Sequence, residues 1–224
     1  MIGKYPLRYK MHFIKLKIRE LVNPGYFISE DNINSNPFEQ FTKWYKKSLV
    51  RQRAYYDAMT LSTATPEGIP SARMVLLKSY DEKGFVFFSN SSSRKGKEIE
   101  ANPNAALTFF WNKTNKQVRI EGILEQIDDN ESDEYFSTRP VMSRLGAWAS
   151  IQSSVISDRK YLLNRLREYE YKFKDAEIPR PPYWVGFRLI PAKIEFWQAR
   201  ANRLHDRFLF TKDNNKWKYV RLSP

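Results

Sequence analysis

Residues 58–89 read AMTLSTATPEGIPSARMVLLKSYDEKGFVFFS and hold strand-like runs separated by turns. Apolar, β-branched and aromatic residues favour strands in three places: 58–64, 71–80 and 85–89. Pro66-Glu67-Gly68 and Asp81-Glu82-Lys83-Gly84 supply the turn residues between the runs. Successive strands joined by tight turns are typical of an antiparallel sheet and not of alternating βαβ units.

The rest of the chain continues this pattern of short strands with a few helices. Further strands are expected at 105–111, 117–127, 183–190, 193–197, 207–210 and 217–221. Helices are expected to begin near Asn36 and Ser93, and over 131–137 and 158–173. The sequence therefore predicts a mainly β protein with helices (α+β), built as an antiparallel barrel or sandwich.

Composition excludes several classes of protein. The 224 residues are 42% hydrophobic and 28% charged, which suits one domain with a real core and argues against a disordered chain. There is no cysteine, which excludes disulfides and thiolate metal sites, and only two histidines, so no metal is expected. No apolar run reaches the length of a signal-peptide core or a membrane span, so we expect a cytoplasmic protein. A basic, partly mobile N-terminal arm over 1–36 is expected to precede a single domain over 37–224.

The formal net charge of +13 suggests anionic partners without choosing among them. A nucleic-acid reader would show a basic stripe with interleaved aromatics or a known motif, and neither is evident. We therefore expect neither a nucleic-acid nor a membrane partner. The absence of a GxGxxG or Walker loop argues against dinucleotide and nucleoside triphosphate folds.

Two clusters place permanent cations beside structured backbone. Arg73 and Lys78 flank an apolar run, and strict alternation along one strand would place them on opposite faces. Ser91-Ser92-Ser93-Arg94-Lys95 combines helix-capping hydroxyls with two cations, a combination suited to phosphate. Both patterns also occur in ordinary structure, as charges at the ends of a buried strand or as a capped helix with solvated charges.

A third cluster, residues 196–207, holds three arginines, one histidine, a tryptophan and a glutamine. On an extended segment, Arg203 and His205 would point to the same face, where they would act on one substrate. The neighbouring arginines should favour the neutral form of His205 at pH 7. A lone histidine is more often structural than catalytic, so the cluster alone does not decide its role.

Six blocks, in this order and spacing, resemble the pyridoxamine 5′-phosphate oxidase family of flavin enzymes, which complete vitamin B6 coenzyme synthesis. The blocks are 73–78 (RMVLLK), 93–95 (SRK), 135–140 (YFSTRP), 146–148 (GAW), 152–154 (QSS) and 203–207 (RLHDR). The resemblance runs from about Pro37 to Pro224. It implies a split β-barrel, antiparallel and Greek-key-like, that works as a homodimer with FMN at the subunit interface.

The resemblance also implies which residues bind. The FMN site would be lined by Arg73, Met74, Val75, Leu76, Leu77, Lys78, Phe88, Ser89, Arg94, Lys95, Gln117, Gln152, Ser153, Trp197 and Arg207. The substrate would be held by Lys78, Tyr135, Arg139, Ser143, Arg203 and His205, the last two being the catalytic pair. A spacing of four would place Tyr135, Arg139 and Ser143 on one helix face, although Pro140 argues against a regular helix there.

The implied reaction is FMN-dependent oxidation of the phosphorylated B6 vitamers pyridoxine 5′-phosphate and pyridoxamine 5′-phosphate to pyridoxal 5′-phosphate, with O2 as acceptor and H2O2 as product. One alternative is a split-barrel flavin reductase acting on another substrate, which would not need the four substrate residues together. The other is a basic nucleic-acid-binding module, which predicts a colourless protein with salt-sensitive affinity.

Two features depart from the family. Ala199 stands where members usually have Gly, which would strain the chain if φ were positive there. The N-terminal arm does not match cleanly, and Arg19 is the one arm residue we would place over the substrate.

Overall fold

The computed structural model describes residues 7–52, 54–214 and 216–224. The chain forms two compact units, of which unit 1 comprises Met1–Met59, Leu107–Glu121 and Pro191–Pro224. Unit 2 comprises Thr60–Ala106 and Gly122–Ile190. The division into an arm over 1–36 and one domain over 37–224 stays a prediction, and residues 1–6 of that arm lie outside the described part of the chain.

The strands of the described residues pair in one sheet with the path β2-β1-β5-β6-β7-β4-β3, while β8 pairs with β7 and β9. Their bounds are β1 (Ala58–Ala64), β2 (Pro70–Leu76), β3 (Ser79–Asp81), β4 (Gly84–Asn90), β5 (Asn104–Trp111), β6 (Lys116–Gln126), β7 (Trp184–Gln198), β8 (Asp206–Asp213) and β9 (Lys216–Arg221). The β3–β4, β4–β7, β7–β8 and β8–β9 pairings are antiparallel. The predicted α+β class with an antiparallel sheet is confirmed.

The helices are α1 (Leu7–Val22), α2 (Pro37–Gln52), α3 (Arg94–Ala101), α4 (Asp129–Ser137), α5 (Val141–Ala149) and α6 (Arg159–Lys172), with short 3-10 turns η1 (Pro24–Tyr26) and η2 (Ala201–Arg203). The expected helices correspond to α2, α3, α4 and α6, whereas α1 and α5 were not predicted. Among the described residues, no helix has the length and apolar character needed to cross a membrane.

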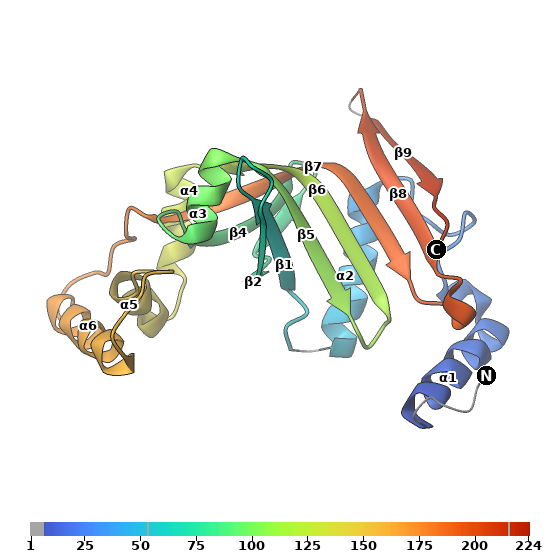
Figure 1. Cartoon of the computed structure of the whole chain (residues 1–224), viewed down its shortest axis with the longest axis horizontal. Helices are drawn as coiled ribbons and strands as arrows, with labels where there is room; N and C mark the ends of the chain where they lie inside the picture. The colour runs from blue at the N-terminus through green and yellow to red at the C-terminus, as the bar shows by residue number, and fades with distance from the viewer. Residues whose placement is uncertain (1–6, 53, 215) are drawn as a thin grey trace. The chain divides into compact units, whose positions relative to one another are not determined.

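The core of unit 1 is aromatic. On α2, Phe38, Phe41 and Trp44 are buried, as their helical spacing predicts. The Phe41 ring lies 5.2 Å from Phe109 of β5, and the Trp44 ring lies 5.3 Å from Phe196 of β7. The hairpin of β8 and β9, red in Figure 1, extends this unit.

The core of unit 2 is built on β4, whose neighbouring residues Phe85, Val86 and Phe87 are all buried. β4 pairs with the first half of β7, and Phe87 stacks on its partner Phe187 at 5.7 Å. Helices α5 and α6 lie side by side, as Figure 1 shows, and contribute to a second cluster with Trp184.

The predicted strand over 71–80 is interrupted, which is a correction. β2 ends at Leu76 and β3 begins at Ser79. Between them the Lys78 amide already donates to Val86 O of β4, at 2.8 Å. Arg73 is half-buried within β2, whereas Lys78 is exposed in the connection. The two cations therefore do not share a strand, and the opposite-face argument is wrong.

Candidate functional site

The turn between β4 and α3, together with Arg94 and Lys95 at the start of α3, is a candidate phosphate-binding site in unit 2, called the phosphate corner below. Ser93 is the N-cap residue of α3, and its hydroxyl accepts from Gly96 N at 3.4 Å while donating to Asn90 O at 2.6 Å. A Cβ at Gly96 would lie 1.9 Å from Ser91 O, so only glycine allows the helix to start this close to the turn. The predicted serine N-cap is confirmed, and it fixes the positive end of the helix dipole beside Arg94 and Lys95.

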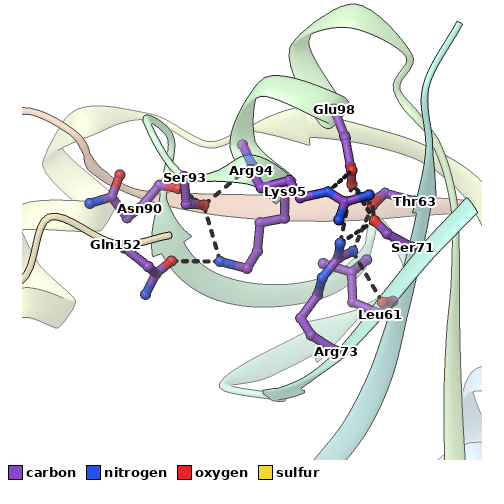
Figure 2. A network of polar contacts seen from close by, with 11 residues as sticks. Leu61, Thr63, Ser71, Arg73, Asn90, Ser93, Arg94, Lys95, Glu98 and Gln152 are labelled. Carbon is purple, nitrogen blue, oxygen red and sulfur yellow. Dashed lines mark hydrogen bonds and ion pairs between the residues drawn. The ribbon is translucent and has the colours of Figure 1, made fainter. Parts of the chain in front are cut away.

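Glu98 links Arg94 of this corner to Arg73 of β2 in one network of polar contacts (Figure 2). Arg94 Nε lies 2.8 Å from Glu98 Oε1, and Arg73 Nη2 lies 3.1 Å from Oε2. Thr63 and Ser71 each donate a hydroxyl to Oε2 at 2.5 Å. Burial alone would raise the pKa of this carboxyl, but the four hydrogen bonds outweigh burial and hold the pKa at about 2. Glu98 is therefore a carboxylate at every pH at which the protein would work.

Lys95 connects the corner to a distant segment of the same unit. Its Nζ lies 2.5 Å from Gln152 Oε1 and 3.1 Å from Ser93 Oγ. Burial, followed by the nearby Arg73 charge, lowers the pKa of Lys95 to about 8. The ammonium form thus still predominates at pH 7. The contact with Gln152 brings together two predicted flavin residues that are far apart in the sequence.

A cavity of about 280 Å³ opens within unit 2, and its walls come from β4, α5, the adjoining connections and the start of β7. It is lined by Phe88, Ser89, Asn90, Arg139, Ser143, Gly146, Ala147, Ser150, Gln152 and Trp184. Five of these were predicted, three for the flavin and two for the substrate. The other five, Asn90, Gly146, Ala147, Ser150 and Trp184, were not predicted as site residues. Asn90 directly precedes the serine run, which was the available signal.

Arg139 is a half-buried cation that lines this cavity. Its guanidinium carbon lies 4.7 Å from the Trp184 ring and 5.4 Å from the Phe136 ring. Its Nη1 is buried without a hydrogen-bond partner in the described part of the chain, and burial lowers the pKa of the group. A buried guanidinium nitrogen without a hydrogen-bond partner costs free energy unless a ligand pairs with it. The arrangement suits an anion.

A broken helix places the three predicted phosphate residues. Tyr135 lies in the last turn of α4, Arg139 lies in the connection, and Pro140 is the N-cap residue of α5, which holds Ser143. A single helix face is therefore wrong, and the break at Pro140 is its physical cause. The bend still brings Arg139 and Ser143 to the same cavity. Tyr135 stacks at 4.3 Å on Phe88, a ring that lines it.

His205 lies in unit 1, next to Trp197. The ring centroids are 4.6 Å apart, and the His205 Nδ1 accepts from Arg200 N at 3.1 Å. Because Nδ1 is an acceptor, the ring proton of the neutral form is on Nε2. Burial first, and the Arg203 charge second, lower the pKa of His205. The expected neutral histidine is confirmed, although burial is the larger cause.

Arg203 is not on an extended segment. It ends η2 with φ of 62°, and Asn202 before it has φ of 57°. The argument that Arg203 and His205 point to the same face assumed an extended backbone, which the structure does not have at Arg203. Ala199 is not among the residues with positive φ, so the condition under which alanine would be strained there is not met; positive φ occurs at Asn202 and Arg203 instead.

Arg207 and Trp197 face each other in the β8–β7 register. The Arg207 Nε lies 2.8 Å from Oε1 of Glu195, and its Nη1 donates to Ser223 O at 2.9 Å. Gln117 is half-buried on β6. The guanidinium of Arg207 is thus held by a buried carboxylate, much as Arg73 is.

The predicted site residues fall in both units. Unit 2 holds Arg73, Met74, Val75, Leu76, Leu77, Lys78, Phe88, Ser89, Arg94, Lys95, Tyr135, Arg139, Ser143, Gln152 and Ser153, and unit 1 holds Gln117, Trp197, Arg203, His205 and Arg207. Within unit 2 the structure joins the corner, Gln152 and the cavity. Within unit 1 it joins Trp197 to both His205 and Arg207.

Sequence comparison defines the class of protein first. The family profile described as Pyridoxamine 5'-phosphate oxidase matches residues 46–173, and the profile described as Pyridoxine 5'-phosphate oxidase C-terminal dimerisation region matches residues 184–224. The fold is a split β-barrel, in agreement with the expectation. The chain belongs to the pyridoxamine 5′-phosphate oxidase family.

Individual relatives agree over most of the chain. It is 54% identical over 198 residues to the pyridoxine/pyridoxamine 5′-phosphate oxidase of Nostoc punctiforme, covering 88% of this chain and 92% of the relative. Identity to the same-named protein of Rubrobacter xylanophilus is 48% over 206 residues, covering 92% and 94%.

Two solved structures are also similar. PhzG from Burkholderia lata, in complex with tetrahydrophenazine-1-carboxylic acid, has a TM-score of 0.82 at 32% identity and covers 91% of this chain and 98% of its own. An FMN-binding protein from Nostoc punctiforme has a TM-score of 0.68 at 19% identity, covering 86% and 100%, and supports the fold alone.

Proposed function

We propose that the chain is a flavin enzyme that oxidises pyridoxine 5′-phosphate and pyridoxamine 5′-phosphate to pyridoxal 5′-phosphate, with O2 as acceptor and H2O2 as product. The observation that carries this proposal is Arg139, which lines the cavity and whose buried Nη1 has no hydrogen-bond partner among the described residues. A substrate phosphate would supply the missing partner. The names of the relatives above support the same substrates.

The corner at Ser93 fits the phosphate of FMN. Gly96 gives a close helix start that any Cβ would fill, and Arg94 is 64% exposed with only its Nε engaged by Glu98. A phosphate monoester carries roughly two negative charges at pH 7, and each charge-assisted hydrogen bond to it contributes about 1.5–3 kcal/mol. Arg94, Lys95 and the Ser93 cap would hold the group, with Gln152 and Ser153 beside it. When bound, FMN supplies the redox chemistry.

Two more parts of the site would bind the flavin. Phe88 and Ser89 line the cavity and would contact it from β4. Trp197, Arg207 and Gln117 would also contact FMN, some of these flavin contacts coming from the partner subunit, as the family resemblance implies. Residues 73–78 would run along the flavin, although Arg73 already bonds Glu98, so its proposed role is to shape the corner.

The substrate phosphate would be held by Arg139 and Ser143 at the cavity wall, with Tyr135 and Lys78. Arg139 brings the charge, and its stacking on Trp184 fixes the plane of the guanidinium. These contacts are the same in ground state and transition state, so they serve binding more than rate.

Arg203 and His205 would orient the carbon that is oxidised. A neutral His205 offers its Nε2–H as a donor, because Nδ1 is occupied by the Arg200 amide. Arg203 has the strained backbone typical of functional positions, with φ of 62°. A displacement of the reacting carbon by about 1 Å can lower the rate roughly a hundredfold.

We further propose a cytoplasmic homodimer with FMN at the subunit interface. The match of residues 184–224 to a dimerisation region supports two-fold assembly. Light scattering of the FMN-loaded protein should give about twice the mass of one 26.7 kDa chain.

A split-barrel flavin enzyme with another substrate is the second candidate. The similarity to PhzG, whose structure holds tetrahydrophenazine-1-carboxylic acid, a ligand without phosphate, favours it. The unpaired Nη1 of Arg139 among the described residues favours a phosphorylated substrate instead. Oxygen uptake should therefore accompany pyridoxal 5′-phosphate formation with the phosphorylated vitamers and be absent with unphosphorylated pyridoxine. A colourless protein that cannot be reconstituted with FMN would contradict the whole proposal.

A further inference from the structure

Glu98 lies behind the phosphate corner and not at its surface. Its side chain is 7% exposed, and it reaches outward from α3 to meet β1 and β2 within unit 2 (Figure 2). Buried carboxylates are rare unless they are paired, and this one accepts from four side chains. Such a concentration of bonds on one carboxylate orders every group that donates to it.

The two carboxylate oxygens of Glu98 have different partners. Among the described residues, Oε1 accepts only from Arg94 Nε, at 2.8 Å, while Oε2 accepts from Arg73, Thr63 and Ser71. The Arg94 side chain is held by one edge and is otherwise 64% exposed. The Nε bond fixes where the guanidinium lies, and the donors of its two Nη atoms are not used by Glu98, so they can serve an oxyanion.

Arg73 is held more completely. Its Nη1 donates to Thr63 Oγ1 at 2.6 Å and to Leu61 O at 3.3 Å, and its Nη2 donates to Ser71 and Glu98. Only 20% of the side chain is exposed. Arg73 thus gives the corner its positive charge without a free fork of donors.

Charge balance gives Glu98 a second role. Arg73, Arg94 and Lys95 are three cations in one corner, and the Arg73 charge already disfavours the ammonium form of Lys95, whereas Glu98 favours it. Without the carboxylate, the three cations would repel one another and the long Arg94 side chain would lose its anchor. A phosphate would then have to order these groups as it binds.

We propose that Glu98 is a positioning residue for flavin phosphate: it holds Arg94 and Arg73 in the arrangement that binds the phosphate, although it does not touch the ligand. The proposal rests on the proposed binding of FMN. It predicts that the neutral isostere Glu98→Gln weakens the affinity for FMN by about ten- to a hundredfold, since one or two charge-assisted bonds lose their geometry. Affinity for riboflavin, which lacks the phosphate, should stay within about twofold.

The test is a fluorescence titration of flavin-free protein with FMN and, separately, with riboflavin. The matched control is Glu100→Gln, because Glu100 is an exposed acid on the same helix and loses the same charge. The control should bind both flavins like the unmodified protein. At saturating FMN, Glu98→Gln should keep its kcat, because the residue acts on cofactor retention only.

A double-mutant cycle separates positioning from general damage to the fold. In the Arg94→Ala background, Glu98→Gln should weaken FMN affinity much less than it does alone, because its main target is gone. Should Glu98→Gln fail to fold, Ser71→Ala removes one bond to the same carboxylate and should give a smaller loss, again for FMN only.

The outcomes are distinct. Equal loss of FMN and riboflavin affinity in Glu98→Gln, or full additivity with Arg94→Ala, would overturn the positioning role. An unmodified protein that binds riboflavin as tightly as FMN would instead overturn the proposed phosphate corner. Selective loss of FMN affinity in Glu98→Gln, absent in Glu100→Gln, supports the proposal.

Discussion

The guanidinium of Arg139 stacks 4.7 Å from the Trp184 ring, while its Nη1 is buried with no partner in the described residues. The same indole also stacks nearly parallel on the Phe88 ring, at 4.9 Å. The group is therefore fixed in orientation but incompletely hydrogen-bonded. Such a residue lowers the free energy of unfolding of the free protein, and an anion that pairs with the guanidinium would offset this loss.

Arg139→Met should accordingly raise the KM for pyridoxine 5′-phosphate by about ten- to a hundredfold, because a charge-assisted phosphate contact is lost. Its kcat should change little, since the contact is made in both ground and transition states. Its Tm should not fall, because no hydrogen bond of Nη1 is lost in the free protein.

Arg180→Met is the matched control for that stability claim. Arg180 is only 9% exposed, like a core residue, but it is paired with Asp129 and Asp133 and donates to Trp184 O. Its loss should destabilise the protein by about 1–3 kcal/mol, by thermal or urea unfolding. Equal destabilisation by both substitutions would show that Arg139 is structural.

Arg203→Ala and His205→Ala should retain FMN but lose about a hundredfold or more in kcat, because orientation of the reacting carbon is lost. The assay is oxygen uptake with pyridoxal 5′-phosphate formation at saturating FMN, so that cofactor loss cannot mimic a catalytic defect. If both variants turn over normally, these two residues do not form the catalytic pair.

The activity that depends on neutral His205 should persist below pH 6.5. Burial and Arg203 lower the pKa of the ring, so it stays neutral in a range where a free histidine would be protonated. Protonation would also break the bond from the Arg200 amide to Nδ1. A kcat profile that falls with an apparent pKa above 6.5 would contradict this assignment.

Local patterns predicted most strands, because alternation and turn residues act over a few positions. β1 was predicted with its exact bounds, and the Ser93 cap followed from its hydroxyl next to helix-forming residues. α5 was missed because Pro140 was interpreted as a helix stop, although proline is well suited to the position where a helix starts. The error came from one residue with two common uses.

The candidate site was harder to predict than the fold, because its geometry depends on contacts between distant segments. The bond from Lys95 to Gln152 spans 57 positions, and no periodicity reports it. Glu98 was not singled out because an acid on a charged helix usually faces water. Family resemblance indicated the candidate binding residues, whereas the carboxylate of Glu98 that pairs with two of them was seen only in the folded structure.

Lys116 provides the last prediction, which concerns stability. Its side chain is buried, and Nζ lies 4.2 Å from the Trp44 ring, with Lys47 and Lys43 as charged neighbours. Burial first, then those two lysines, lower its pKa from 10.5 to about 7. Between these values the unfolded chain binds a proton that the folded chain does not, so the free energy of unfolding rises with pH through this window.

Lys116→Met removes this dependence of the free energy of unfolding on pH. It should stabilise the protein, and the gain should be larger at pH 6 than at pH 9 by roughly 2–3 kcal/mol. Urea unfolding at both pH values measures it, with the exposed Lys113→Met as control. A gain that is equal at the two pH values, or a loss at pH 6, would mean that Lys116 stays charged in the folded protein and is stabilised there by Trp44.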